Sequence, residues 1–75
     1  MIGFVLISLN HGDEQKVQAE LQLLEQVTEV HILFGEWDLI AKVTVDGPEA
    51  LSTFVMDAVR TIPEIKMSST LIVAK

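Results

Sequence analysis

The stretch VHILFGEWDLIAKVTV, residues 30–45, decides the fold because it joins two alternating segments through one short turn. Apolar and polar residues alternate from Val27 to Phe34 and again from Leu39 to Val45. Alternation with a period of two is typical of half-buried strands. Gly35 permits the positive φ that a tight turn needs. The stretch therefore predicts a β-hairpin whose turn is FGEWDL.

The alternation also assigns each hairpin residue to one face of the sheet. The face expected to contact helices carries Val30, Ile32, Phe34, Leu39, Ala41, Val43 and Val45. The opposite face carries Glu29, His31, Leu33, Ile40, Lys42 and Thr44. A strand from Met1 to Leu9 is apolar at almost every position, which indicates a central strand covered on both faces. A last strand is predicted over Ile65–Ala74.

Two amphipathic helices are predicted between the strands. The first covers Asp13–Gln26, with Asn10 or Asp13 as the N-cap and apolar residues at helical spacing: Val17, Leu21 and Leu24. The second begins at Asp46–Glu49, where Asp46 and Glu49 resemble a capping box and Pro48 fits the first turn. Its apolar face carries Leu51, Phe54, Val55, Ala58 and Ile62. Pro63 ends it.

The order β-α-β-β-α-β over residues 1–75 predicts one α+β domain with a ferredoxin-like fold, an antiparallel four-stranded sheet with both helices on one face. Such a short chain buries only about 60% of its unfolded surface, yet 49% of its residues are hydrophobic. The uncovered sheet face would be a larger apolar patch than monomers usually expose. We therefore expect two copies to dimerise face to face through their sheets.

Composition excludes several classes of function. With 11 acidic and 5 basic residues the net charge is -6, and no basic patch favours direct nucleic-acid binding. The absence of cysteine excludes disulfides and thiolate sites, and it fits a cytoplasmic protein. The N-terminal apolar run is too short and lacks the basic flank of a signal peptide or membrane span. Neither a phosphate-binding glycine motif nor metal-ligand spacing is present, so no cofactor and no metal are expected.

The most informative polar groups lie in the turn and in the last strand. Gly35 lets a ligand approach the backbone, Glu36 and Asp38 can accept from an ammonium group, and Trp37 offers an apolar wall. Ser68, Ser69 and Thr70 can donate to a carboxylate. An α-amino acid needs both kinds of partner. The plainer interpretations are an ordinary hairpin turn and an edge strand with a polar face.

These residues resemble the effector-sensing domain of Lrp/AsnC transcription regulators, also called the RAM domain. The resemblance covers essentially the whole chain. That family joins its second and third strands by a Gly-x-(aromatic)-Asp turn, matched here by Gly35–Asp38. An apolar-Pro-x-apolar exit from the second helix follows, matched by Ile62–Ile65, before a Ser/Thr-bearing last strand. Phe34 departs from the small hydroxyl residue that often precedes the glycine.

The resemblance implies a non-enzymatic module that dimerises through its sheets, assembles into octameric rings and binds an amino acid or a similar small molecule between dimers near the turn. The helix-turn-helix of the family does not precede the first strand, so a stand-alone form that modulates DNA-binding relatives is expected. Two alternatives stay open. One is a small dimeric α+β barrel enzyme using His31 or His11 with a carboxylate, and the other is a purely structural assembly module.

Overall fold

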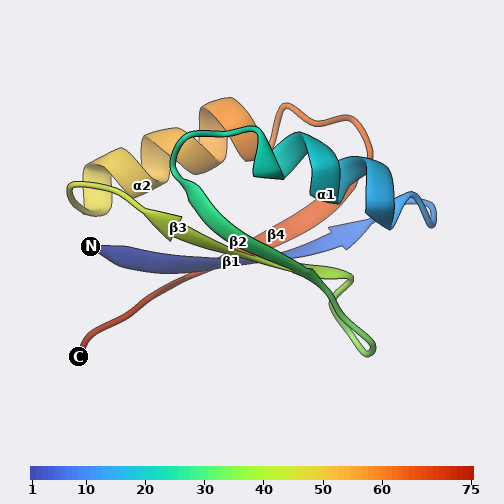
Figure 1. Ribbon diagram of the computed structural model, residues 1–75, viewed down its shortest axis with the longest axis horizontal. Helices are drawn as coiled ribbons and strands as arrows, with labels where there is room; N and C mark the ends of the chain where they lie inside the picture. Colours follow the sequence, from blue (N-terminus) through green and yellow to red (C-terminus); the bar gives the residue numbers. More distant parts are fainter.

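The computed structural model describes all residues of the chain, and its elements follow the predicted order (Figure 1). The strands are β1 (Ile2–Leu9), β2 (Val27–Ile32), β3 (Leu39–Thr44) and β4 (Ile65–Ile72). The helices are α1 (Glu14–Gln22) and α2 (Pro48–Phe54), which continues into a π-helical turn, η1 (Val55–Val59). Both helices lie on one side of the sheet, and the other side is left open (Figure 1). Neither helix has the length and the continuous apolar sequence that a membrane-spanning helix needs.

The four strands form one antiparallel sheet in the order β2-β3-β1-β4. Strand β1 lies in the interior of the sheet, as its apolar sequence predicts, and β2 and β4 form the two edges. Both βαβ units connect strands that are not neighbours, which interleaves the two halves of the chain. This is the predicted ferredoxin-like fold.

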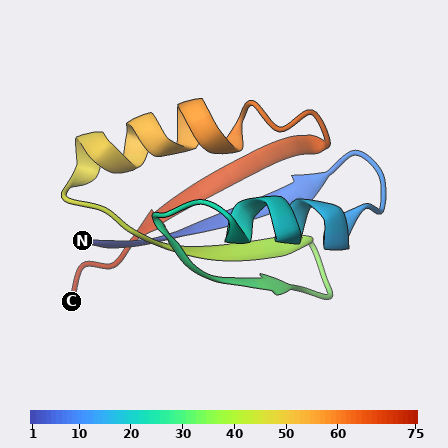
Figure 2. The same cartoon turned by 45° about the horizontal axis from the view of Figure 1, so that its top comes forward.

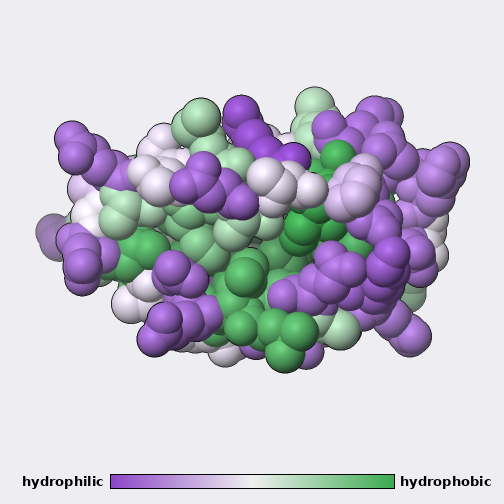
Figure 3. Space-filling model, turned by 90° about the horizontal axis from the view of Figure 1, so that it is seen from above, coloured by the Kyte–Doolittle hydropathy of each residue, from purple (hydrophilic) through white to green (hydrophobic).

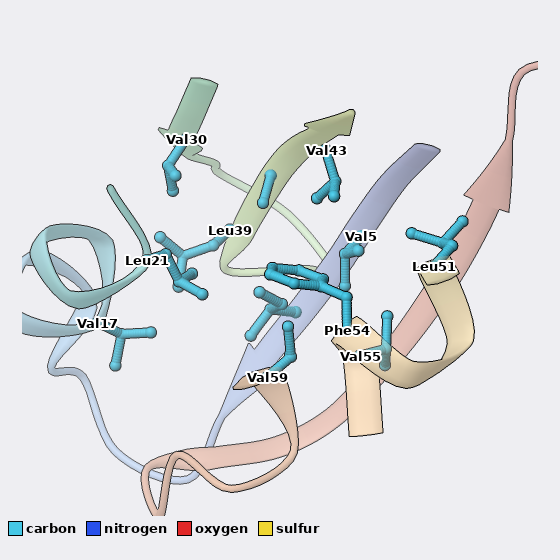
Figure 4. Close-up of a cluster of buried hydrophobic side chains, with 12 residues drawn as sticks. Val5, Val17, Leu21, Val30, Leu39, Val43, Leu51, Phe54, Val55 and Val59 are labelled. Atoms are coloured by element: carbon cyan, nitrogen blue, oxygen red, sulfur yellow. The ribbon is translucent and has the colours of Figure 1, made fainter. Parts of the chain in front are cut away.

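The core lies between the sheet and the helices (Figure 4). Its twelve residues are Val5, Ile7, Val17, Leu21, Val30, Leu39, Ala41, Val43, Leu51, Phe54, Val55 and Val59. The predicted core face of β3 is confirmed, since Leu39, Ala41 and Val43 are at most 1% exposed. No polar or charged residue is buried. The helix side is nevertheless not fully sealed, because apolar side chains reach the surface along its middle (Figure 3).

Gly3 explains how closely α2 approaches β1. A Cβ atom at this position would lie 2.8 Å from Leu51 Cδ2 and 3.3 Å from the Leu71 carbonyl oxygen. The missing side chain therefore makes room for Leu51, which is 1% exposed. The sequence predictions did not single out this glycine, because only the packing shows why a side chain would not fit.

The helix caps differ from the predictions. Asp13 is the N-cap residue of α1, but its side chain makes no capping hydrogen bond. The predicted capping box of Asp46 and Glu49 is wrong, since Gly47 is the N-cap of α2 and no side chain caps it. Extended φ and ψ at Gly47 place the helix start one residue later than Asp46. Pro48 does occupy the first turn, as predicted.

The predicted strand and helix lengths need small corrections. Helix α1 ends at Gln22 instead of Gln26, and β4 ends at Ile72 instead of Ala74. Strand β2 ends at Ile32, which is 43% exposed, and Phe34 is fully exposed. Ile32 pairs with the core residue Leu39 and so keeps the predicted face, although it is partly uncovered on the edge strand. The assignment of Phe34 to that face is wrong. Beyond Ile32 the chain leaves the sheet, so alternation no longer determines which side a residue faces.

Candidate functional site

Asp38 holds the end of the β2–β3 turn against strand β1. Its backbone N–H donates to the Ile7 carbonyl at 2.9 Å, and its carboxylate Oδ2 accepts from the Leu9 N–H at 2.7 Å. Its own carbonyl accepts from the Leu33 N–H at 2.9 Å. One carboxylate oxygen is therefore engaged within the chain, and Oδ1 makes no hydrogen bond to another protein group. Three hydrogen bonds of Asp38 therefore fix the end of the turn.

The remaining turn residues project outward from this anchor. Gly35 has φ +126°, a conformation that residues with a side chain rarely adopt. Phe34, Gly35 and Glu36 are exposed, and Trp37 is half-buried. Nothing lies within 4 Å of the position that a Cβ of Gly35 would occupy. Backbone and side chains of the turn are therefore accessible, as the ligand hypothesis requires.

The three hydroxyl residues lie on the edge strand β4, and the pleat divides them. Ser68 pairs with Ile7 and Thr70 pairs with Val5, both core residues, so these two hydroxyls belong to the helix side. Ser69 pairs with Leu6 and belongs to the open face. The edge position of β4 agrees with the plainer interpretation, but the three hydroxyls do not form one polar face.

One chain does not bring the turn and the hydroxyls into contact. Ile7 pairs with Leu39 on one side and with Ser68 on the other, so β1 separates them. Two strand spacings correspond to about 10 Å. A single small ligand would therefore contact only one of the two groups within this chain.

The open face of the sheet is apolar over β1 and β4. Leu6 and its strand partner Ile40 lie in the middle of this face. Both are half-buried, although no helix covers them. Across from Phe4, Leu71 is 51% exposed. Met67 and Val73 add further exposed apolar surface at 55% and 42%. The predicted apolar face is thus present, with no element of the chain covering it (Figure 1).

Charged residues gather along the β2 edge of the same face. Glu29 Oε1 lies 3.2 Å from His31 Nε2, and Glu29 Oε2 lies 3.5 Å from Lys42 Nζ. Hydrogen bonds from His31 and Lys42 lower the pKa of Glu29 below its ordinary value. The His31 side chain is 63% exposed. The pair lies on the sheet surface rather than in an enclosed site.

His11 lies elsewhere, in a polar groove of about 440 Å³ lined by Asn10, His11, Asp13, Pro63 and Glu64. No group of three or more His, Cys, Asp or Glu residues is arranged to hold a metal ion. Two polar atoms are buried without a partner, Ser8 Oγ and Glu64 Oε1. Neither Ser8 nor the Leu9 N–H was predicted to matter from the sequence, although both lie next to Asp38. Their role depends on the hydrogen bonds between the end of β1 and the turn, which the sequence does not show.

The chain thus combines a ferredoxin-like sheet, an anchored Gly-x-Trp-Asp turn and an uncovered apolar face. The family model "Lrp/AsnC ligand binding domain" matches residues 2–75. The chain belongs to this family.

Curated relatives agree with this membership. The chain is 31% identical over 75 residues to the HTH-type transcriptional regulator FL11 of Pyrococcus abyssi and 33% identical over 72 residues to the regulatory protein AsnC of Escherichia coli. It is covered to 100% and 96% in these alignments, which include 49% and 46% of the two relatives. The chain thus spans about half the length of the curated relatives it matches.

Solved structures match equally well. The crystal structure of FFRP-DM1 has a TM-score of 0.90 at 36% identity and covers 96% of both chains. Escherichia coli AsnC has a TM-score of 0.91 at 32% identity, covering 99% of this chain and 51% of its own. A transcriptional regulator from Neisseria meningitidis, crystallised as a complex with L-Met, shares the fold with a TM-score of 0.88 at 21% identity over 99% of this chain and 49% of its own.

Proposed function

We propose that this chain is a non-enzymatic effector sensor that binds an amino acid or a similar small metabolite and works as an oligomer. The single observation that carries the proposal is the anchored Gly35–Asp38 turn within a chain of the Lrp/AsnC ligand binding domain family. The turn presents an accessible backbone and a carboxylate oxygen without a protein partner. The Neisseria meningitidis complex with L-Met supports an amino acid as the first ligand to test.

The proposed ligand contacts follow the chemistry of the two ends of an amino acid. Asp38 Oδ1, with help from Glu36, accepts from the ammonium group. The Gly35 N–H and a hydroxyl of β4, from Ser68, Ser69 or Thr70, donate to the carboxylate. Trp37 packs against the side chain of the ligand.

We further propose that a second copy completes this site. Within one chain the turn and the hydroxyls lie on opposite sides of β1, roughly 10 Å apart. A ligand that bridges both groups therefore needs the hydroxyls, or other donors, of a neighbouring copy. Binding and assembly are coupled under this proposal, because the ligand is bound fully only in the oligomer.

The open sheet face is the proposed dimer interface. Its centre carries Phe4, Leu6, Ile40 and Leu71, with Met67 and Val73 beside them. The charged cluster of Glu29, His31 and Lys42 lies at the rim, where ions stay in water. Two copies packed face to face bury the apolar centre and keep the rim solvated. Such dimers are proposed to assemble further, up to octameric rings.

The relatives are transcription regulators, so we propose that this domain influences transcription in the cytoplasm, by mixed assembly with DNA-binding relatives. It is not proposed to bind nucleic acid itself, because its net charge is -6. The enzyme alternative finds little support, since His31 and Glu29 are paired on an exposed surface, where their side chains are 63% and 50% exposed.

A thermal-shift screen against the twenty amino acids, run beside analytical ultracentrifugation, tests the proposal. A ligand present at about 100 times its Kd adds roughly 2.7 kcal/mol of stability, which corresponds to a rise in Tm of about 10 °C or more for a domain of this size. The same ligand should shift the protein toward the larger assembly. If the ultracentrifuge shows a monomer with every amino acid, the coupling between binding and assembly is wrong.

A further inference from the structure

Helix α2 and η1 run alongside the edge strand β4 (Figure 2). A crevice lies between them on the helix side of the sheet. Two grooves make it up. One, of about 390 Å³, is lined by Arg60, Ile65, Lys66, Met67 and Ser68. The other, of about 280 Å³, is lined by Pro48, Leu51, Ser52, Val55, Met56, Arg60, Thr70 and Ile72. Arg60 lines both grooves and so joins them into one crevice. The end near Lys66 and Ser68 is polar, and the end near Leu51, Val55 and Ile72 is more apolar.

The polar end concentrates hydrogen-bond donors that the protein itself does not use. Lys16 and Lys42 are paired with Glu64 and Glu29. Arg60 and Lys66 form no ion pair and donate no side-chain hydrogen bond, although acidic residues outnumber basic ones 11 to 5. No acidic residue lines the groove that they share.

Ser68 adds a third donor to this end of the crevice. Its side chain is on the helix side of β4, and its hydroxyl makes no hydrogen bond to another protein group. Ile65 provides apolar lining beside it, and Met67 borders the groove at the edge of β4. The end of the helix near Arg60 presents carbonyl oxygens, which repel anions. Attraction for an anion must therefore come from the side chains of Arg60, Lys66 and Ser68. Substituting them should weaken anion binding directly.

We propose that this crevice is a second ligand site, which takes an organic anion whose carboxylate or phosphate group is bound by Arg60, Lys66 and Ser68. The apolar part of the ligand lies along the crevice toward Met56 and Ile72, which are 60% and 49% exposed without a ligand. Within one chain this site lies across β1 from the β2–β3 turn. Ser68 is also a candidate for the amino-acid site, but Arg60 and Lys66 belong to the crevice alone, so their effect on anion binding does not depend on the amino-acid site.

Nuclear magnetic resonance titration of the ¹⁵N-labelled protein tests this proposal with hexanoate, hexyl phosphate and the uncharged hexanamide. Hexanoate or hexyl phosphate should shift the amide signals of Arg60 and Ile65–Ser68 saturably, and the tighter of the two identifies the anion. Hexanamide should bind at least about tenfold more weakly, since it lacks the charge that the donors recognise. Equal affinity of hexanamide would overturn the proposal.

The matched variants are Lys66→Gln and Lys75→Gln, which change the net charge equally. The exposed Lys75 lies beyond β4 and lines neither groove. Lys66→Gln should weaken anion affinity about threefold, because it removes one charge-assisted contact at an exposed site. Lys75→Gln should bind as the unmodified protein does. Equal loss in both variants would show that the anion responds only to net charge and would overturn the site.

Discussion

The carboxylate of Asp38 accepts a hydrogen bond from the Leu9 N–H at 2.7 Å, so a side chain of the turn takes the place of a strand carbonyl at the end of β1. The same residue donates its own N–H to Ile7 at 2.9 Å. Asp38 thus extends the β1–β3 pairing beyond the last pair of the ladder. The residue proposed to bind a ligand is also a residue that fixes the turn, and the two roles make different predictions.

The structural role of Asp38 is tested without any ligand. Asp38→Ala leaves the partly buried Leu9 N–H without its acceptor, which should lower the free energy of unfolding by about 1–3 kcal/mol. Asp38→Asn keeps an oxygen acceptor and should cost clearly less. Urea denaturation of the two variants measures the difference. Equal stability of Asp38→Ala and the unmodified protein would show that the bond to Leu9 contributes nothing.

The close packing of α2 on β1 is tested at Gly3. Gly3→Ala places a Cβ 2.8 Å from Leu51 Cδ2 and should lower the free energy of unfolding by about 1–3 kcal/mol through overpacking. Gly12→Ala is the control, because its Cβ would meet only the Glu14 carboxylate oxygens at ordinary distances of 3.6 and 3.7 Å. Denaturation curves that show the same loss for both variants would contradict the steric explanation.

The fold was predictable from the sequence because its period-two and helical patterns are local. Leu39, Ala41 and Val43 alternate with Ile40 and Lys42, and this alternation placed the helix-contacting face of β3 correctly. The antiparallel sheet then followed from the order of the elements. Phe34 was placed wrongly, since alternation has no meaning once the chain leaves the sheet.

The candidate site was predictable only in part. The sequence indicated Gly35 and Asp38 through the turn chemistry that they supply, and Gly35 does have a positive φ. It did not show that the Asp38 carboxylate bonds to Leu9 or that the pleat separates Ser69 from Ser68. Both facts depend on how β1 pairs with its two neighbours, which is a long-range relationship. The buried Ser8 hydroxyl was missed for the same reason.

The proposed dimer interface is tested by placing a charge on the open face. Leu71→Lys should shift the protein from dimer to monomer at micromolar concentration, since a lysine at the centre of an apolar interface must lose water without a partner. The fold should persist, because Leu71 is 51% exposed in the single chain. Leu23→Lys, at a position that is 85% exposed beside α1, is the control. Sedimentation velocity that shows the same assembly for both variants would argue against this interface.

The ion pair between Lys16 and Glu64 predicts a pH dependence of stability. A hydrogen bond from Lys16 lowers the pKa of Glu64 below its ordinary value of 4.5, and the same bond raises the pKa of Lys16 above 10.5. The stabilisation is therefore fully present between these two values. It is lost as the pH falls through the lowered pKa of Glu64 or rises through the raised pKa of Lys16.

Lys16→Met removes this pair. The difference in unfolding free energy between the unmodified protein and Lys16→Met should stay constant around neutral pH and shrink in acid, as Glu64 becomes protonated. Urea denaturation over a pH series measures it. A difference that grows as the pH falls would mean that the pair does not stabilise the fold.

The central claim, that this domain senses an amino acid through the Gly35–Asp38 turn, is tested most directly by the thermal unfolding midpoint measured with each of the twenty amino acids. We predict that at least one raises the midpoint by several degrees at millimolar concentration. If none of the twenty changes the midpoint, the proposed amino-acid site is contradicted.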